Sequence, residues 1–311
     1  MDPICHTLTG AALGCTGLQK RSRFGRATLI IAANLPDVDA VTYLVDGVDS
    51  LGIRRGVTHG VPALVVLPVL LALAMKGLSL LMRGAPLKQD ADFRQLWLLS
   101  AIGMATHPFL DYLNNYGMRW LMPFVDRWVY GDTLYIVDPV VWAILLSGVI
   151  LTAAVKGERT AWWRRPAAIA LAVMGAYIAL NAGGTLLARH ATVTVLQNDP
   201  PSRLMASPVL MRPLERRLVL EYEDVYRVGK VDLFPELSVE IEDLAIPKGD
   251  PRDLARAATT VDARVFLHWA RFPFTESQLI HNSRVIRVMD ARYVREWEDG
   301  FGAIAVNVPV D

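Results

Sequence analysis

The sequence contains an uncharged apolar run at residues 166–187, PAAIALAVMGAYIALNAGGTLL, which decides the class of fold. A helix needs about 20 apolar residues to cross a bilayer, so this run has the required length. Hydrophobic residues make up 53% of the 311 residues, and three further apolar runs precede this one. Core helices of a large soluble protein could carry one such run, but several together favour a membrane protein. The further runs are Val61–Met82, Leu96–Leu113 and Pro139–Val155.

The N-terminal segment and the overall charge exclude two other classes. The formal net charge is +1, which gives no support to nucleic-acid binding through bulk electrostatic attraction. Asp2 stands where a cleaved signal peptide has its basic region, so we expect the segment to be retained. Cys5 and Cys15 are about 15 Å apart along a helix, too far for a disulfide. We expect two buried thiols.

The two parts of the chain differ in composition. Residues 1–189 hold nearly all the apolar runs, whereas residues 190–311 are charged and mixed. We therefore predict a mainly α membrane protein, with a bundle of five to six membrane-embedded helices over 1–189 and a soluble α+β domain over 190–311. Alternating apolar and polar residues predict the strands of the second domain, and a helical pattern lies near Pro251–Ala258. The expected strands cover 190–196, 217–223, 237–242, 283–289 and 303–308.

Basic residues between the apolar runs predict the orientation in the membrane. Lys and Arg concentrate in cytoplasmic loops, so the loops after the first and third of these runs should face the cytoplasm. The segment 114–137 and the C-terminal domain would then lie on the outer side. Four arginines on the predicted outer side argue against this orientation: Arg54, Arg55, Arg119 and Arg127. The basic residues that support it are Arg83, Lys88, Arg94, Lys156, Arg159, Arg164 and Arg165.

The segment His107-Pro-Phe-Leu-Asp111 interrupts an apolar run with two ionisable residues. Such residues inside a membrane segment usually serve a site or a pathway. At a spacing of four, both side chains project from one helix face and can reach the same cation. A direct hydrogen bond between them would explain the spacing equally well, and Pro108 would kink or begin a helix.

Other residues of metal-binding type lie at a similar predicted depth. Counting 1.5 Å per residue from the nearest cytoplasmic basic residue puts His6, Asp37 and the His107–Asp111 pair about 16 to 26 Å deep. His59 begins its helix at the same end. Mixed His and carboxylate ligands without thiolates favour an open catalytic site for zinc or manganese, which would activate water for hydrolysis. The predicted metal ligands are His6, Asp37, His59, His107 and Asp111.

Several neighbouring residues are candidates for supporting roles. Asp39 could act as a general base or as a carboxylate that orients a ligand. Asn115 and Tyr116 could orient ligands or substrate. Asp132 and Asp138 could also support the ligands, but they could equally begin helices, a role that Asp138 before Pro139 fits at least as well.

These residues lie in short motifs through which the sequence resembles the YdjM-like family of membrane-bound, metal-dependent hydrolases, some of them called LexA-binding, inner membrane-associated. The resemblance implies a bacterial inner membrane location. It does not extend LexA binding to this chain. The motifs are Met1-Asp-Pro-Ile-Cys-His6, Asn34-Leu-Pro-Asp-Val-Asp39, Arg55-Gly-Val-Thr-His59, Thr106-His-Pro-Phe-Leu-Asp111, Asn115-Tyr-Gly117, Ile136-Val-Asp-Pro139 and Ala270-Arg-Phe-Pro273.

The family is itself distantly similar to zinc-dependent phospholipase C and P1-type nucleases. That similarity implies one metal held by Asp37, His59, His107 and Asp111, and a second held partly by His6 and Asp111. The later His and His-x-x-x-Glu group of those enzymes is missing here, so a one- or two-metal site is expected. Asp111 would act in catalysis as a metal ligand.

Three functions follow as alternatives. The first is hydrolysis of a phosphoester, with a small molecule or a membrane lipid as substrate. The second is structural metal binding by a non-catalytic protein whose C-terminal domain recruits a partner. The third, an ion or proton pathway, suits intramembrane His and Asp residues in general but fits poorly with ligands confined to one half of the bilayer.

Overall fold

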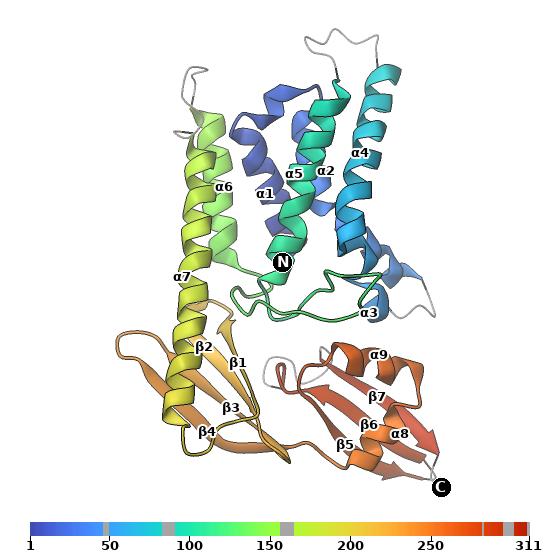
Figure 1. Ribbon diagram of the computed structural model, residues 1–311, viewed down its shortest axis with the longest axis vertical. Coiled ribbons are helices and arrows are strands. Elements are labelled where there is room, and N and C mark those ends of the chain that lie inside the picture. Colours follow the sequence, from blue (N-terminus) through green and yellow to red (C-terminus); the bar gives the residue numbers. More distant parts are fainter. Residues whose placement is uncertain (46–49, 83–90, 156–164, 282, 295–301, 310–311) are drawn as a thin grey trace. The chain divides into compact units, whose positions relative to one another are not determined.

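The computed structural model describes residues 1–45, 50–82, 91–155, 165–281, 283–294 and 302–309. The chain divides into two compact units (Figure 1). The helical unit comprises Met1–Leu44 and Ile53–Gly183, and the C-terminal unit comprises Val45–Gly52 and Gly184–Asp311. The boundary predicted from the sequence lies between residues 189 and 190.

The helical unit consists of α-helices joined by short 3-10 helices. Three of its helices begin after an aspartate whose side chain accepts hydrogen bonds from the first turn, namely Asp2, Asp92 and Asp138. The α-helices are α1 (Pro3–Cys15), α2 (Gly25–Asn34), α4 (Val61–Leu81), α5 (Phe93–Tyr112), α6 (Pro139–Ala154) and the first part of α7 (Pro166–Val195). The 3-10 helices are η1 (Leu18–Arg21), η2 (Leu35–Leu44) and η3 (Val57–His59).

Glycines bring α1, α2 and α5 unusually close together. A Cβ atom on Gly10 of α1 would lie 2.8 Å from the carbonyl oxygen of Leu29 in α2. A Cβ atom on Gly103 of α5 would lie 2.8 Å from the same oxygen. Both distances are below normal contact, so the backbones can approach only because these residues lack side chains. This packing fixes the helices that carry His6 and His107.

The predicted bundle of five to six membrane-embedded helices is wrong. Among the described residues, two helices are long and apolar enough to cross a membrane: α4 and α7. With 13, 10 and 16 residues, α1, α2 and α6 are shorter than the span of about 20 that a bilayer requires. The 20-residue α5 buries polar and ionisable residues along its length, including Ser100, His107 and Asp111. Its polar positions face the protein interior, so its length alone does not make it a membrane span.

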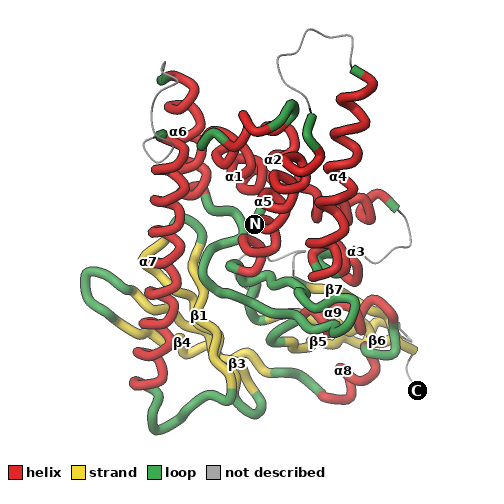
Figure 2. Tube along the Cα trace, turned by 45° about the horizontal axis from the view of Figure 1, so that its top comes forward, coloured by secondary structure: helices red, strands yellow, loops and turns green. Residues whose placement is uncertain are grey.

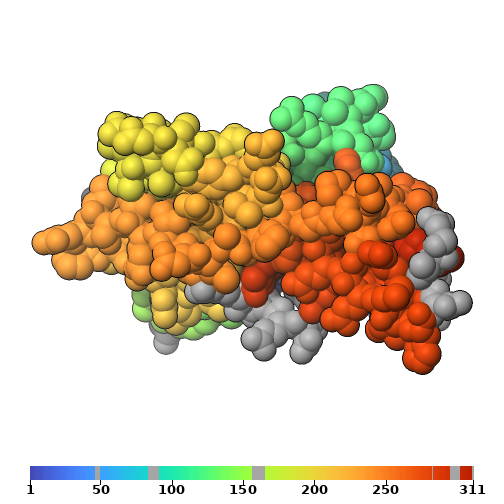
Figure 3. Space-filling model, turned by 90° about the horizontal axis from the view of Figure 1, so that it is seen from below, coloured from blue at the N-terminus to red at the C-terminus, as the bar shows by residue number. Residues whose placement is uncertain are grey.

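The described part of the C-terminal unit contains two antiparallel sheets, the end of α7 and further helical segments (Figure 2). The first sheet has the order β1 (Arg203–Val209), β2 (Arg212–Glu221), β3 (Val225–Asp232), β4 (Ser238–Pro247). The second has the order β5 (Pro273–Ile280), β6 (Ser283–Asp290), β7 (Ala303–Pro309). The helices are α3 (Ser50–Ile53), α8 (Pro251–Ala257) and α9 (Val261–Trp269). Figure 3 shows the side-chain surface of this unit, from the first sheet in orange to the second in red.

Four of the five predicted strands and the predicted helix at Pro251 are confirmed, since they coincide with β2, β4, β6, β7 and α8. The strand predicted at 190–196 is wrong, because α7 continues as a helix to Val195. The hydroxyls of Thr192 and Thr194 donate to the carbonyls of Ala188 and His190, four residues earlier. Thr192 and Ala188 are also fully buried, and Ala188 packs against the first sheet. These contacts override the β-propensity of the segment.

Of two further predictions, one is confirmed and the other is not tested. Cys5 and Cys15 are free and buried, as expected. Residues Arg83, Lys88, Lys156, Arg159 and Arg164, on which the orientation depends, lie outside the described residues. The orientation therefore stays a prediction.

Candidate metal centre

Three histidines and two aspartates from four segments meet inside the helical unit. His6 comes from α1, Asp37 from η2, His59 from η3, and His107 and Asp111 from α5. Their ligand atoms form two overlapping groups that could hold a cation, His6–His107–Asp111 and Asp37–His59–His107. The histidines and Asp111 are fully buried, whereas the Asp37 side chain is 15% exposed. The structure thus brings together all five predicted ligands, with Asp37 at the accessible side.

The distances among His59, His107 and Asp111 fit a single cation. The Nε2 atoms of His59 and His107 are 3.1 Å apart. Asp111 Oδ2 lies 3.3 Å from the first of these nitrogens and 3.6 Å from the second. Ligand atoms about 2.0 to 2.2 Å from a tetrahedral zinc ion are about 3.3 to 3.6 Å from one another. The three atoms therefore have the spacing of a zinc coordination shell.

Asp37 is positioned to complete this shell. Its Oδ1 lies 3.9 Å from His59 Nε2, and its Oδ2 lies 3.8 Å from His107 Nε2. These distances are slightly longer than those among the other three ligands. Arg54 also forms an ion pair with Asp37, at 3.0 Å. Asp37 is the ligand with the most freedom to adjust.

His6 and the other oxygen of Asp111 form a second group beside the first. His6 Nε2 lies 3.3 Å from Asp111 Oδ1, and the His6 ring stacks on the His107 ring at 3.7 Å between centroids. Asp111 Oδ1 also contacts the α-amino group of Met1. The two oxygens of Asp111 therefore face different histidines. A carboxylate in this position can bridge two cations.

A hydrogen bond fixes the His107 ring. His107 Nδ1 lies 2.7 Å from the carbonyl oxygen of Ala33, which can only accept, so Nδ1 carries the hydrogen. The neutral ring then directs the lone pair of Nε2 toward His59 Nε2. Metal-ligating histidines commonly use this backbone arrangement to hold their orientation.

Asp39 and Thr58 fix the His59 ring from the other side. The Thr58 hydroxyl donates to Asp39 Oδ2 at 2.9 Å and lies 3.0 Å from His59 Nδ1. Asp39 Oδ2 also accepts from the backbone N–H of Arg55 at 2.9 Å, and the Arg54 guanidinium contacts Oδ1. All these partners lie between residues 54 and 59. Of the two roles predicted for Asp39, its contacts favour orienting His59.

The charges around His59 determine its protonation and that of Asp39. Burial raises the pKa of Asp39, but the hydrogen bond with His59 and the Arg54 charge outweigh it and lower the pKa below its usual value. Burial lowers the pKa of His59, but Asp111 and Asp39 outweigh that effect and raise it. Asp39 is thus ionised at neutral pH, and a metal at His59 competes with a proton.

The unsatisfied atoms of the cluster fit a bound cation. With Nδ1 of both rings facing hydrogen-bond acceptors, Nε2 of His59 and Nε2 of His107 face each other at 3.1 Å. Two neutral rings in this arrangement would oppose their lone pairs, so either a cation or a proton on His59 Nε2 lies between them. His6 makes no hydrogen bond through either nitrogen. Buried polar atoms are normally satisfied, so this concentration of exceptions indicates a ligand site.

Arg55 also belongs to the centre, although its sequence context indicated only the orientation of the chain in the membrane. Its guanidinium is buried and reaches both oxygens of Asp111, with Nη2 at 3.1 Å from Oδ1 and Nε at 3.0 Å from Oδ2. It also donates to Asn114 Oδ1 and to the Gly117 carbonyl. The motif Arg55-Gly-Val-Thr-His59 contained both Arg55 and Thr58. Only His59 of this motif was predicted as a metal ligand, because arginine and threonine are not usual metal ligands.

The remaining predicted residues occupy varied positions. Tyr116 packs its ring on the Arg55 guanidinium at 4.6 Å, so it supports the residue that holds Asp111. Asn115 and Asp132 are buried, the latter with a positive φ of 50°. Asp138 precedes α6 and accepts hydrogen bonds from the N–H groups of Val140 and Val141. Of the two roles predicted for Asp138, these contacts favour beginning a helix. His190, His268 and His281 belong to neither metal-binding group among the described residues.

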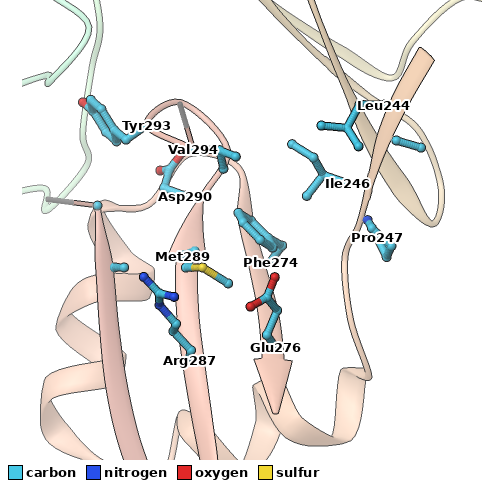
Figure 4. Close-up of a pocket in the computed structure, with 13 residues that line it drawn as sticks. Leu244, Ile246, Pro247, Phe274, Glu276, Arg287, Met289, Asp290, Tyr293 and Val294 are labelled. Atoms are coloured by element: carbon cyan, nitrogen blue, oxygen red, sulfur yellow. The ribbon is translucent and has the colours of Figure 1, made fainter. Parts of the chain in front are cut away.

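A separate cavity of about 330 Å³ lies in the C-terminal unit (Figure 4). Its walls include Ile246 from β4, Phe274 from β5 and Met289 from β6. Glu276 and Arg287, opposite each other on β5 and β6, supply charged atoms. No group of metal-binding type is found at this cavity among the described residues. Its lining is mainly apolar.

The fold and the site together define a helical membrane protein with a buried His and carboxylate centre. Residues 1–186 match the model of the family described as YdjM inner membrane protein, and the match includes every residue of the centre. The chain belongs to this family. The resemblance predicted from the motifs is thereby confirmed.

One curated relative illustrates the extent of the match. The chain is 26% identical over 163 residues to an uncharacterized protein, YfhP, of Bacillus subtilis strain 168. The alignment covers 49% of this chain and 46% of the relative, so the chain spans about half the length of the curated relative it matches. No solved structure matches the chain. The distant similarity to phospholipase C and P1 nuclease is not shown by these comparisons.

Proposed function

We propose that this protein is a membrane-bound, metal-dependent hydrolase of a phosphoester, with a lipid or a small molecule as substrate. The observation that carries the proposal is the pair of opposed Nε2 atoms of His59 and His107, 3.1 Å apart beside the Asp111 carboxylate. A cation bound between these nitrogens would satisfy the buried cluster. Its open side, at Asp37, gives a substrate access.

The donor set suits a divalent ion, with zinc favoured and manganese an alternative. His59, His107, Asp111 and Asp37 would hold one ion, and His6 with Asp111 would contribute to a second. Such an ion supplies Lewis-acid polarisation of a phosphoryl oxygen and activation of water.

The surrounding residues orient the ligands and supply positive charge. The Ala33 carbonyl and Asp39 set the directions of the His107 and His59 rings. Arg54 lies beside Asp37, and its side chain is 16% exposed. A guanidinium in this position can pair with phosphate oxygens. This arrangement favours a phosphoester over an uncharged ester.

The test measures metal content and hydrolysis together. Wild type, His107→Ala and the matched control His190→Ala, an exposed histidine of α7, are purified in detergent. Bound metal is measured by mass spectrometry, and turnover is measured on bis-p-nitrophenyl phosphate and a phospholipid panel. We expect wild type and His190→Ala to bind metal and hydrolyse an ester, and His107→Ala to do neither.

Two results would contradict the proposal in different ways. Metal bound without turnover of any ester would favour a non-catalytic membrane protein that uses the metal structurally and recruits a partner through its C-terminal unit. Absence of metal from the wild type, purified without chelators and supplied with zinc and manganese, would contradict both functions.

A further inference from the structure

An exposed apolar stripe lies on the 3-10 helix that carries two residues of the metal centre. Val38, Val41 and Leu44 of η2 are 54%, 56% and 84% exposed. Residues three apart in a 3-10 helix lie on one face, so these side chains form a single line. Asp39, on another face of η2, is buried, and Asp37 contributes to the centre. One short helix therefore faces the metal centre with its polar side and presents hydrocarbon on its outer side.

A second group of exposed apolar residues lies at the start of α4. Val57 and Val61 are 52% and 47% exposed, and Phe124 on the adjoining loop is 79% exposed. This loop is held directly against the helix start, because the Val61 N–H donates to the Trp120 carbonyl at 3.0 Å. A Cβ atom on Gly60 would lie 2.2 Å from the Met122 carbonyl oxygen, so the two backbones are in contact.

The two groups border the same site. Arg54 links them, because its guanidinium pairs with Asp37 of η2 and its carbonyl accepts from Arg119 Nη2, on the loop that carries Phe124, at 2.9 Å. Helices η2 and η3 also pack against each other. We call the exposed residues Val38, Val41, Leu44, Val57, Val61 and Phe124 the apolar rim.

The position of α4 identifies what covers the apolar rim. This helix is long and apolar enough to cross a membrane, and it begins at Val61, two residues after His59 (Figure 1). Val65, one turn further along, is 65% exposed, and Leu73 is 52% exposed. The rim is thus continuous with the exposed surface of a candidate span. Lipid hydrocarbon can cover both surfaces without a boundary between them.

We propose that the apolar rim contacts lipid acyl chains and holds the metal centre at the boundary between hydrocarbon and headgroups. A phospholipid resting on the rim would have its phosphate ester near the partly exposed Asp37 and Arg54. The inferred contact with lipid rests only on the exposed residues and does not depend on the proposed function. The choice of a membrane phospholipid as substrate rests on the proposed function.

A fluorescent label can test the contact without any enzymatic activity. Cysteine is introduced at Val41 or Leu44, and at Arg127 as an exposed control on the same loop as Phe124. Native Cys5 and Cys15 are buried, so they should label slowly. Each variant carries an environment-sensitive maleimide dye and is reconstituted into phosphatidylglycerol and phosphatidylethanolamine vesicles. Quenching by lipids with a nitroxide on the upper acyl chain is compared with quenching by aqueous iodide.

The expected result is stronger lipid quenching and weaker iodide quenching at residues 41 and 44 than at residue 127, by about threefold, because an interfacial apolar face is buried in the acyl boundary. Equal quenching at all three positions would overturn the proposal. Protection from both quenchers at 41 and 44 would also overturn it, because a protein surface would then cover the rim.

A second variant separates this inference from the proposed function. The triple variant Val38→Ser, Val41→Ser, Leu44→Ser changes exposed side chains, so bound metal should equal that of wild type. We expect its apparent KM for phospholipid in vesicles to rise about tenfold, as burial of apolar area contributes to interfacial binding. An unchanged KM would overturn the substrate assignment. If the wild type hydrolyses no ester, the proposed function fails, and the quenching result still decides whether the rim contacts lipid.

Discussion

Two regions of this molecule bury a carboxylate among positive charges, and they differ in how completely its neighbours are satisfied. In the C-terminal unit, Asp290 accepts from the Arg271 N–H and from the backbone and side chain of Arg292, at 2.6 to 3.0 Å. The Arg292 guanidinium also lies over the Trp269 ring at 4.5 Å. In the helical unit, Asp111 also pairs with an arginine, yet neither nitrogen of nearby His6 makes a hydrogen bond.

The difference distinguishes a structural ion pair from a ligand site. A buried network with every member satisfied holds the fold and has no capacity for another ligand. A network with unsatisfied acceptors costs free energy unless something else binds there. The Asp290 network is of the first kind, and the centre at Asp111 is of the second. Variants of each aspartate should therefore fail in different ways.

The largest effect is expected from Asp111→Asn. This change removes the carboxylate that faces both histidine groups, so metal affinity should fall by more than about 100-fold, beyond the effect of losing a residue that only orients a ligand. Competition with a chelator measures the affinity. Asp290→Asn is the matched control and should bind metal like wild type. Comparable losses in the two variants would remove the distinction between the regions.

The converse variant should affect stability. Asp290→Asn leaves the buried Arg292 guanidinium without a full counter-charge, which should destabilise the C-terminal unit by about 3 to 5 kcal/mol. Hydrogen exchange of the β6 amides reports this loss. Glu240→Gln, which breaks an exposed pair with Lys230, should change stability by less than about 1 kcal/mol. The prediction fails if β6 exchanges at the wild-type rate in Asp290→Asn.

Metal removal should affect one unit and leave the other unchanged. A ligand at 100 times its dissociation constant stabilises the state that binds it by about 2.7 kcal/mol. Chelation should therefore speed amide exchange in α5 and around η3, while β6 remains as protected as before. Hydrogen exchange before and after chelator treatment measures both. Faster exchange in both units would mean that the metal stabilises the chain as a whole.

A smaller effect is expected where a residue only orients a ligand. Asp39→Asn weakens the contacts that hold the His59 ring, so metal affinity should fall by about 10- to 100-fold. The matched control is Asp126→Asn, a surface carboxylate paired with Arg119. Calorimetric titration with zinc compares the two. A loss as large as that in Asp111→Asn would mean that Asp39 binds the metal directly.

The five residues that meet in the centre could be selected from the sequence because their chemistry stands out against an apolar background. His6, Asp37, His59, His107 and Asp111 are ionisable residues where packing gives no reason for them. The residues that orient them are harder to recognise. The Ala33 carbonyl belongs to the backbone, so no side chain in the sequence indicates its role. Arg55 resembles the basic residues that flank membrane segments, and only its contacts with Asp111 show a different role.

The fold was predictable where local pattern and tertiary packing agree. Alternation predicted β2, β4, β6 and β7 correctly. It failed at residues 190–196, where Ala188 packs on the first sheet and Thr192, one turn later in α7, is fully buried. Hydrophobicity likewise identified α4 and α7 as candidate spans but overstated α5 and α6. Apolar composition does not reveal whether a helix faces lipid or its neighbours.

The smallest effect concerns Asp253, a buried carboxylate of the C-terminal unit whose arginine partners, Arg256 and Arg284, are 34% and 33% exposed. Burial raises the pKa of Asp253, but the Ser277 hydroxyl at 2.5 Å and the Arg284 guanidinium at 3.0 Å outweigh it and lower the pKa below 3.8. A lowered pKa in the folded state means that the stabilisation is complete above the unfolded-state value of 3.8. It is lost as the pH falls through the folded-state value.

Asp253→Asn should therefore destabilise the C-terminal unit by about 1 kcal/mol at neutral pH, a value typical of pairs that are partly solvated. The difference from wild type should vanish in strong acid, where Asp253 is protonated. Hydrogen exchange of β5 at several pH values, corrected for intrinsic rates, measures the difference. A gap that persists at the lowest pH would show that Asp253 acts through packing. A gap as large as that of Asp290→Asn would show that a buried aspartate gains as much from a partly exposed arginine as from a buried one.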